Sequence, residues 1–320
     1  MLPTIVVPQD GSILAERALP YATRLARSAG ARVVLVRATA ATPLPGADAG
    51  AAQRAAVARA EAELGVIADR LRDEGVAADA HVYYDAADAA ILDAARQHHA
   101  DLVVMSTHGR SGLGRWVYGS VADAVLRATP APVLLVPAAC AATWAAAEPP
   151  RVLVPLDGSA LAEAALDPIA DFAAGLGAEL LLVQVVESPL PMLSDGTVYL
   201  PKWDEESLLV AARQYLEERA AAPLRAAGHT VRTLAVAGPA SAVGQAAAVL
   251  ADAAETEGAA LIAMATHGRG GLARLVLGSV ATGVLRRARV PLLLVRPAAA
   301  ERRVANVPAV EVACMAPAAP

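Results

Sequence analysis

Short, continuously apolar runs alternate along the chain with longer stretches in which apolar residues recur at helical spacing. The apolar runs predict strands at 4–8, 32–38, 77–84, 101–106 and 132–136, then at 151–155, 179–186, 229–236, 260–265 and 291–295. The stretches between them predict helices at 12–29, 51–74, 86–98 and 120–127, then at 159–174, 203–227, 240–257 and 279–288. Continuously apolar strands separated by helices predict an α/β fold in which helices cover both faces of a parallel sheet.

The chain contains one long internal repeat. The segment THGRSGLGRWVYGSVADAVLRATPAPVLLVP at 107–137 returns as THGRGGLARLVLGSVATGVLRRARVPLLLVR at 266–296, with 19 of 31 positions identical and no gap. This repeat indicates a duplicated domain, and the length of 320 residues agrees with two domains. We predict a first domain at 1–137, a linker at 138–150, a second domain at 151–297 and a poorly ordered Ala- and Pro-rich tail at 298–320.

Composition and charge argue against a nucleic-acid-binding, membrane-spanning or secreted protein. The net charge of −5 argues against broad nucleic-acid binding. Prolines or glycines interrupt both long uncharged stretches, 128–147 and 233–251, so we expect no membrane span, and no signal peptide is visible. Neither Cys140 nor Cys314 has metal-ligand spacing, and we expect a reducing cytoplasm as the compartment.

A glycine-rich loop follows the fourth predicted strand in each half. The residues that carry its pattern are Gly109, Arg110, Arg115, Gly119 and Ser120 in the first half, and Gly268, Arg269, Arg274, Gly278 and Ser279 in the second. Glycine lets a backbone approach a ligand closely, and a helix N-terminus offers amide groups and a partial positive charge that suit phosphate. The alternative is that each Gly-Ser pair is only a helix start and each glycine only a turn.

An aspartate follows the first predicted strand in each half, within VPQDGS and VPLDGS. Ligands of doubly wound sheets bind beyond the carboxyl ends of the strands, so Asp10 and Asp157 would face the glycine loop across a crevice. A carboxylate there could accept a hydrogen bond from an adenine amino group or a ribose hydroxyl, or it could cap the following helix. His108 and His267 could be general acids or phosphate ligands, but a role in shaping the turn is favoured because no acid or nucleophile stands near them.

Common nucleotide motifs are missing from the sequence. It has no G-x4-G-K-[ST], and the sole lysine, Lys202, could not serve two P-loops. The segment 268–273 matches G-x-G-x-x-A by letter, but it follows the fourth strand instead of the first. No hydrolytic triad, metal-ligand cluster or pair of catalytic carboxylates is recognisable.

Both halves resemble universal stress protein domains. The family's signature, G-x2-G-x9-G-[ST] after the fourth strand, is met at Gly109, Gly119 and Ser120 and at Gly268, Gly278 and Ser279, with Ser106 and Ala265 in place of the first glycine. The resemblance covers 1–137 and 150–297. It implies two doubly wound five-stranded parallel-sheet domains, each of order 3-2-1-4-5, that pair through their fifth strands as an intrachain pseudo-dimer.

The resemblance also implies an ATP site in each half, with adenine near the aspartate and phosphates on the glycine loop; any Mg²⁺ would be held mainly by the phosphates. By matching positions, the site residues are Asp157, Val185, Met264, Ala265, His267, Gly268, Arg269, Gly278 and Ser279, and in the first half Asp10, Ala38, Met105, Ser106, His108, Gly109, Arg110, Gly119 and Ser120. The first half departs further from the pattern, because Arg37 precedes Ala38 and Asp85 stands where the second half has Gly238. We therefore expect the second site to be the better one.

The leading function is that of an ATP-binding stress protein that is regulatory and not catalytic, with at most weak ATP hydrolysis. We expect an intrachain pseudo-dimer or homo-oligomer with no nucleic-acid or membrane partner. One alternative is an interaction scaffold of the same fold that binds no nucleotide, which the missing first glycines favour. Another is an enzyme that transfers an adenylyl or phosphoryl group, which the lack of an evident base disfavours.

Overall fold

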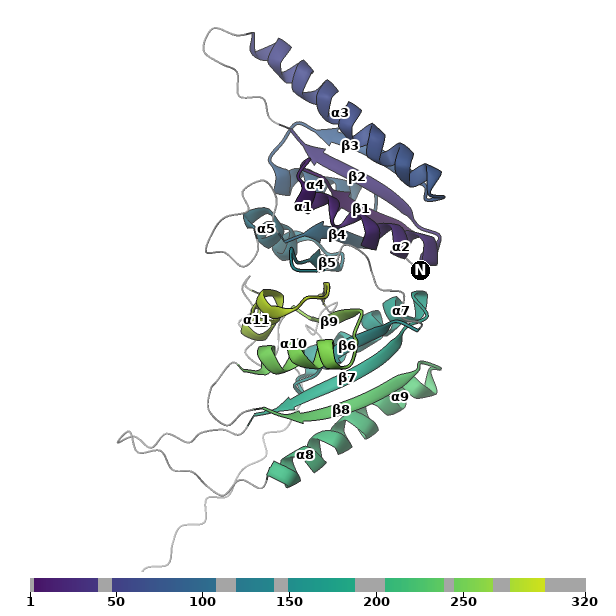
Figure 1. Cartoon of the computed structure of the whole chain (residues 1–320), viewed down its shortest axis with the longest axis vertical. Coiled ribbons are helices and arrows are strands. Elements are labelled where there is room, and N and C mark those ends of the chain that lie inside the picture. The colour runs from purple at the N-terminus through teal and green to yellow at the C-terminus, as the bar shows by residue number, and fades with distance from the viewer. Residues whose placement is uncertain are drawn as a thin grey trace, which may run out of the picture.

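The computed structural model describes residues 3–39, 48–107, 119–140, 149–187, 205–238, 245–266 and 277–296 (Figure 1). Its strands are β1 (Thr4–Pro8), β2 (Arg32–Ala38), β3 (Ala78–Tyr83), β4 (Leu102–Ser106), β5 (Val133–Val136), β6 (Arg151–Pro155), β7 (Glu179–Val186), β8 (Val231–Ala237), β9 (Leu261–Ala265) and β10 (Leu292–Val295). They form one ten-stranded sheet of order β3-β2-β1-β4-β5-β10-β9-β6-β7-β8. Pairs within each half are parallel, so the predicted α/β class and the order 3-2-1-4-5 are confirmed for both halves.

Helices cover both faces of the sheet. The first half has α1 (Ile13–Glu16), α2 (Leu19–Ala29), α3 (Ala49–Asp73), α4 (Ala87–Gln97) and α5 (Ser120–Ala128); the second has α6 (Ala160–Ala164), α7 (Leu166–Gly175), α8 (Glu205–Gln214), the π-helix η1 (Tyr215–Ala221), α9 (Ala222–Ala226), α10 (Ala246–Thr256) and α11 (Ser279–Arg287). Val33 and Leu35 of β2 pack into the core with α2 and α3, whereas Val34 and Val36 pack into the core with α4 and α5. Because both faces are buried, the central strands β1, β4, β5, β6, β9 and β10 are mostly apolar, whereas the edge strands β3 and β8 are more exposed and carry polar residues.

The two halves meet where β5 and β10 pair. This pairing, which we call the seam, is antiparallel, with Leu134 opposite Leu293 and Leu135 opposite Leu292. All four leucines are buried. Each fifth strand would be a sheet edge without the other, so the seam completes the hydrogen bonding of both strands. The predicted intrachain pseudo-dimer is confirmed by this arrangement (Figure 1).

Three helices differ from the pattern-based prediction. The single helix predicted over 12–29 is divided into α1 and α2, and the one over 159–174 into α6 and α7. Pro20 and Pro168 stand in the first turns of α2 and α7, where a proline is tolerated because its missing N–H has no helical partner. The helix predicted over 203–227 passes through the π-helical turns of η1 just before Pro223.

The predicted domain boundaries remain predictions, but the start of the predicted linker packs on the first half. Arg17 of the segment after α1 donates a hydrogen bond to the Ala138 carbonyl group, and Cys140 is buried in the core beside Tyr21. Burial raises the pKa of the Cys140 thiol to about 12, which disfavours the reactive thiolate form. The predicted tail at 298–320, with Cys314, lies outside the described residues.

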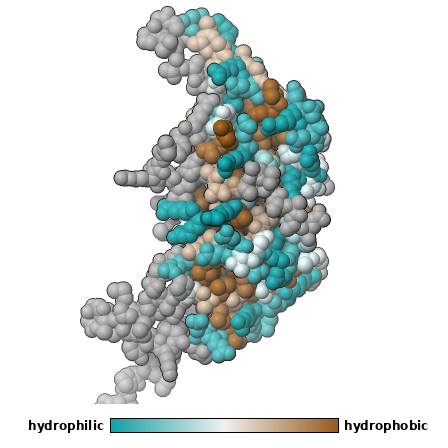
Figure 2. Space-filling view, in the orientation of Figure 1, coloured by the Kyte–Doolittle hydropathy of each residue, from teal (hydrophilic) through white to brown (hydrophobic). Residues whose placement is uncertain are grey.

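Hydrophilic residues cover much of the face seen in Figure 2, and hydrophobic residues gather in patches on both halves. Over the described part of the chain, we find no helix with the length and apolar character that crossing a membrane requires.

Candidate functional site

The carboxyl ends of β1 and β4 diverge at the switch point of the first half, since β1 has β2 on one side and β4 on the other. A cavity of about 260 Å³ lies there, between these strand ends, α4 and the start of α5. Its lining residues are Pro8, Gln9, Asp10, Ala15, Val36, Ala38, Ala87, Ile91, Met105, Ser106, Thr107, Gly119, Ser120, Val121 and Ala122. We call this cavity the first crevice.

Six of the residues predicted for the first site line the first crevice together: Asp10, Ala38, Met105, Ser106, Gly119 and Ser120. The other three, His108, Gly109 and Arg110, lie outside the described residues. In the second half the corresponding elements hold Asp157 after β6, Val185 in β7, Met264 and Ala265 at the end of β9, and Gly278 and Ser279 at the start of α11. We call that region the second crevice; His267, Gly268 and Arg269 are not among the described residues.

Each strand-exit aspartate shapes a tight turn. The Ser12 amide donates to Oδ1 of Asp10 at 2.9 Å, and the Ser159 amide donates to Oδ1 of Asp157 at 3.0 Å. The intervening Gly11 has a φ of 80°, a conformation that favours glycine. The helix cap itself comes from the serine, since the Ser12 hydroxyl accepts from the Ala15 amide at 3.1 Å. The Asp10 carboxylate therefore lies at the first crevice, and its hydrogen bond to the Ser12 amide fixes the turn.

In both halves a backbone hydrogen bond joins the end of the fourth strand, β4 or β9, to the start of the following helix, α5 or α11. The Gly119 amide donates to the Thr107 carbonyl group at 2.7 Å, and the Gly278 amide donates to the Thr266 carbonyl group at 3.0 Å. Both threonines are buried. The sequence prediction did not include them, although Thr107 and Thr266 open the internal repeat and so carried a signal. Ile91, which reaches the first crevice from α4, had no such signal.

None of the described residues requires a glycine at position 119. Its φ of −65° and ψ of 158° are open to any residue, and among the described residues a Cβ built on it would meet nothing closer than the Thr107 carbonyl oxygen at 3.5 Å. Gly119 is also the N-cap of α5, and it supplies no capping side chain there. A small residue at this position therefore leaves the helix start open to the crevice.

Arg37 turns away from the first crevice. It is buried on the opposite face of the sheet, where its Nε donates to the Gln9 carbonyl group at 2.9 Å and its guanidinium pairs with Glu63 of α3. Hydrogen bonds from Arg59 and then Arg37 lower the pKa of Glu63 to about 2. Arg37 is not one of the lining residues, so it supplies no reason for the first site to be the weaker one.

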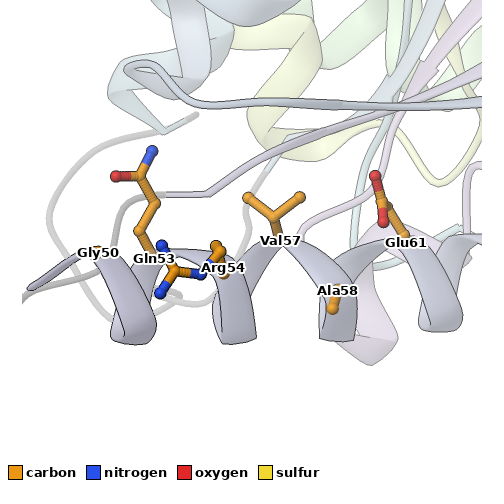
Figure 3. Close-up of a pocket in the computed structure, with 6 residues that line it drawn as sticks. All are labelled: Gly50, Gln53, Arg54, Val57, Ala58 and Glu61. Atoms are coloured by element: carbon orange, nitrogen blue, oxygen red, sulfur yellow. The ribbon is translucent and has the colours of Figure 1, made fainter. Parts of the chain in front are cut away.

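A larger hollow of about 380 Å³ runs along the N-terminal part of α3 (Figure 3). Gly50, Gln53, Arg54, Val57, Ala58 and Glu61 line it, and all six belong to that one helix. It therefore brings together no polar groups from different elements, whereas the first crevice does. Within the described ranges no group of three or more His, Cys, Asp or Glu side chains could hold a metal ion.

Comparison with known proteins decides the family. The sequence model of the universal stress protein family matches residues 1–137 and 149–296. The chain belongs to the universal stress protein family. A universal stress protein of Mycobacterium tuberculosis is 30% identical over 207 residues, which are 62% of this chain and 63% of that protein. One of Mycolicibacterium smegmatis is 28% identical over 235 residues, 72% of this chain and 74% of that protein.

Solved structures show the same fold for this universal stress protein. A crystal structure from Archaeoglobus fulgidus covers 92% of this chain and 98% of its own, with a TM-score of 0.66 and 21% identity. One from Pseudomonas aeruginosa covers 92% and 94%, with a TM-score of 0.60 and 19% identity. The match to the mycobacterial relative from M. tuberculosis spans just under two thirds of that protein's length, 63%.

Proposed function

We propose that this universal stress protein binds an adenine nucleotide such as ATP at its two crevices and acts as a regulator, not as a catalyst. The observation that carries the proposal is the open N-terminus of α5 at Gly119. The described residues around Gly119 would accept a Cβ, and Gly119 lines the first crevice, where glycine keeps the helix start accessible. Room for a close backbone approach is what a phosphate at a helix N-terminus requires.

The residues around each crevice suit the parts of such a nucleotide. The starts of α5 and α11 offer backbone amides and the positive end of the helix dipole to phosphate. Asp10 and Asp157 offer carboxylate oxygens to a base or ribose donor, and apolar groups such as Ile91 line the first cavity. ATP would bring the charged phosphates, together with any Mg²⁺ that they hold, and the chain would supply the binding and the orientation.

The described lining of the first crevice supports a regulatory role. Its described lining includes one carboxylate, Asp10, whose Oδ1 is engaged in the turn, and no histidine or lysine. A general base poised next to the helix start is not part of this set, so binding without rapid turnover is the chemistry that it suits.

The competing scaffold function rests on Ser106 and Ala265, which stand where the family signature has glycine. We place the protein in the cytoplasm, where the buried thiol of Cys140 would stay reduced.

We further propose that the second crevice binds more tightly. Gly238 follows β8 there, and a Cβ on it would lie 3.2 Å from a methyl group of Val185. Glycine thus leaves Val185 in place beside the proposed base position, whereas the first half has Asp85 after β3 and the smaller Ala38. More apolar surface beside the base favours the second crevice.

Calorimetric titration of the full-length chain with ATP tests both proposals. We expect two binding events in the parent, loss of the weaker one in Gly119→Val and loss of the tighter one in Gly278→Val. The matched control is Gly65→Ala in α3, where a Cβ would meet nothing within 4 Å. A parent chain that binds no ATP would support the scaffold instead. If a chain that carries both Gly119→Val and Gly278→Val binds ATP like the parent, the site assignment is overturned. If Gly119→Val removes the tighter binding event, the order of the two sites is reversed.

A further inference from the structure

The helix at the first crevice is held at its other end by the second half of the chain. The nine residues of α5 span about 13 Å from the crevice at Gly119 to the seam. At its last turn, Nη2 of Arg296 donates to the carbonyl groups of Leu126 at 2.8 Å and Arg127 at 2.7 Å. Arg296 directly follows β10, so these two hydrogen bonds cross from the second half to the first.

Both acceptors belong to the part of α5 that needs an outside donor. The last carbonyl groups of a helix have no intrahelical N–H partner, and they carry the negative end of the helix dipole. The rigid, planar fork of the guanidinium directs both N–H groups of Nη2 at the two carbonyl groups, and its permanent positive charge complements the helix dipole.

The contact is not repeated by the pseudo-symmetry of the chain. The repeat places Pro137 at the position of Arg296, and a proline side chain has no donor to offer α11. Both helices have an arginine at equivalent positions of the last turn, Arg127 and Arg286, and α11 adds Arg287. The second half therefore supports the site helix of the first half without an equivalent return contact from this position.

We propose that Arg296 is a positioning residue for the first crevice, through which the second half sets the affinity of the first half for its ligand. The inference rests on the proposed nucleotide function. Arg296 fixes the C-terminus of α5 against the seam, and this holds the helix start at Gly119 in the position that receives the phosphate. By linkage, a nucleotide bound at the start of α5 strengthens the Arg296 contact by the same factor.

The test is ATP titration of full-length chains that carry Gly278→Val, so that only the first crevice binds. We expect Arg296→Ala to weaken this binding about two- to fivefold, the size of a helix-terminus charge effect. Arg296→Lys should restore part of the loss, since it keeps the charge without the fork. The matched control is Arg289→Ala, which removes an arginine whose side chain is 75% exposed and lies 3.7 Å from Glu255.

Two further measurements separate positioning from a general loss of stability. In chains that carry Gly119→Val, Arg296→Ala should leave the affinity of the second crevice unchanged. Hydrogen exchange of the α5 amides should slow on ATP binding in the Gly278→Val chain, and less so with Arg296→Ala. Equal effects of Arg296→Ala on both crevices, or none on the first, would overturn the inference while leaving the proposed function intact.

The remaining outcomes are also decisive. If Arg296→Ala does not fold, Arg296→Lys and Arg296→Gln replace it; affinities in the order Arg, Lys, Gln support the inference, and equal affinities overturn it. A parent chain that binds no ATP overturns the proposed function first, and this inference with it.

Discussion

Two glycines of this chain, Gly119 and Gly283, have different neighbours, and these neighbours indicate different reasons for a glycine. Gly119 faces a cavity, and the fold would accept a Cβ there. Gly283 in α11 faces α10, and a Cβ built on it would lie 2.5 Å from the Ala247 side chain. The first is a candidate for a ligand-binding role, whereas the second permits two helices to pack closely. The same distinction between ligand and fold applies to Asp10, whose carboxylate also shapes a turn.

Asparagine at position 10 separates the two roles of that carboxylate. In Asp10→Asn the amide oxygen can still accept from the Ser12 amide, but a donor replaces the second carboxylate oxygen. We expect the melting temperature to stay near that of the parent while ATP binding at the first crevice weakens about tenfold, as for a lost charge-assisted hydrogen bond. Asp10→Ala should lower both quantities. Unchanged affinity in Asp10→Asn would restrict Asp10 to the turn.

Gly283→Ala should destabilise the second half. A Cβ at 2.5 Å from that of Ala247 cannot be relieved by a rotamer change, so α10 and α11 must move apart. We expect a loss of about 1–3 kcal/mol in the free energy of unfolding, measured by denaturant titration, despite the higher helix propensity of alanine. Gly65→Ala, which meets nothing within 4 Å, should be neutral or stabilising. Equal stability of the two variants would contradict the close packing.

At the scale of elements, the two halves have the same strand order but different ion pairs between their strands and helices. The buried Arg37 pairs with Glu63 of α3, and the repeat places Gln184 and Leu216 at these positions in the second half. At the opposite ends of the strands, Arg151 and Arg232 pair with Glu179 and Glu257. The equivalent positions in the first half hold Thr4, Arg32, Asp79 and His98, with charge of the other sign at Arg32 and Asp79. The strand pairing is retained although these charges are reversed.

The Glu63 carboxylate, which accepts hydrogen bonds from Arg59 and Arg37, gives the first half a pH dependence of its own. Because the folded pKa of Glu63 is lowered from 4.5 to about 2, its contribution is present above pH 4.5 and is lost as the pH falls toward 2. Glu63→Gln should therefore lower stability at pH 7, and most of the difference from the parent should be lost as the pH falls from 4.5 to 2. Thermal unfolding across that range measures it. Glu61→Gln, at an exposed position of the same helix, is the control, and a gap that persists at pH 2 would contradict the ion-pair origin.

The elements were predictable from sequence where a local pattern determines them. Every strand was predicted to within two residues. The central strands leave a nearly unbroken apolar run because both of their faces are buried, whereas the edge strands β3 and β8 carry polar residues among the apolar ones. The divisions between α1 and α2 and between α6 and α7 were not predicted, since apolar spacing continues across Pro20 and Pro168. Motif spacing predicted Asp10 and Gly119 as site residues, and both line the first crevice, whereas Ile91 and the Arg296 contact depend on packing between distant segments.

At the scale of the whole molecule, the hydrophobic core does not stop at the seam. One cluster contains Leu134 and Val136 from the first half together with Leu293 and Val295 from the second. A second cluster on the other face joins Val125 of α5 to Val284 of α11. Separating the halves would expose two central strands and this apolar surface, so we expect the described chain to unfold as one unit.

A matched pair of distant core variants tests that expectation. Leu71 of α3 and Leu224 of α9 occupy equivalent positions in the repeat, and both are buried at 2% and 5% exposure. Truncating either to alanine should cost about 2–5 kcal/mol through lost burial and a cavity. If the seam couples the halves, scanning calorimetry will show a single transition in the parent, with equal calorimetric and van't Hoff enthalpies, and each variant will lower the temperature of that one transition. Two transitions, of which Leu71→Ala lowers one and Leu224→Ala the other, would show that the halves unfold separately and that the seam transmits little between the two crevices.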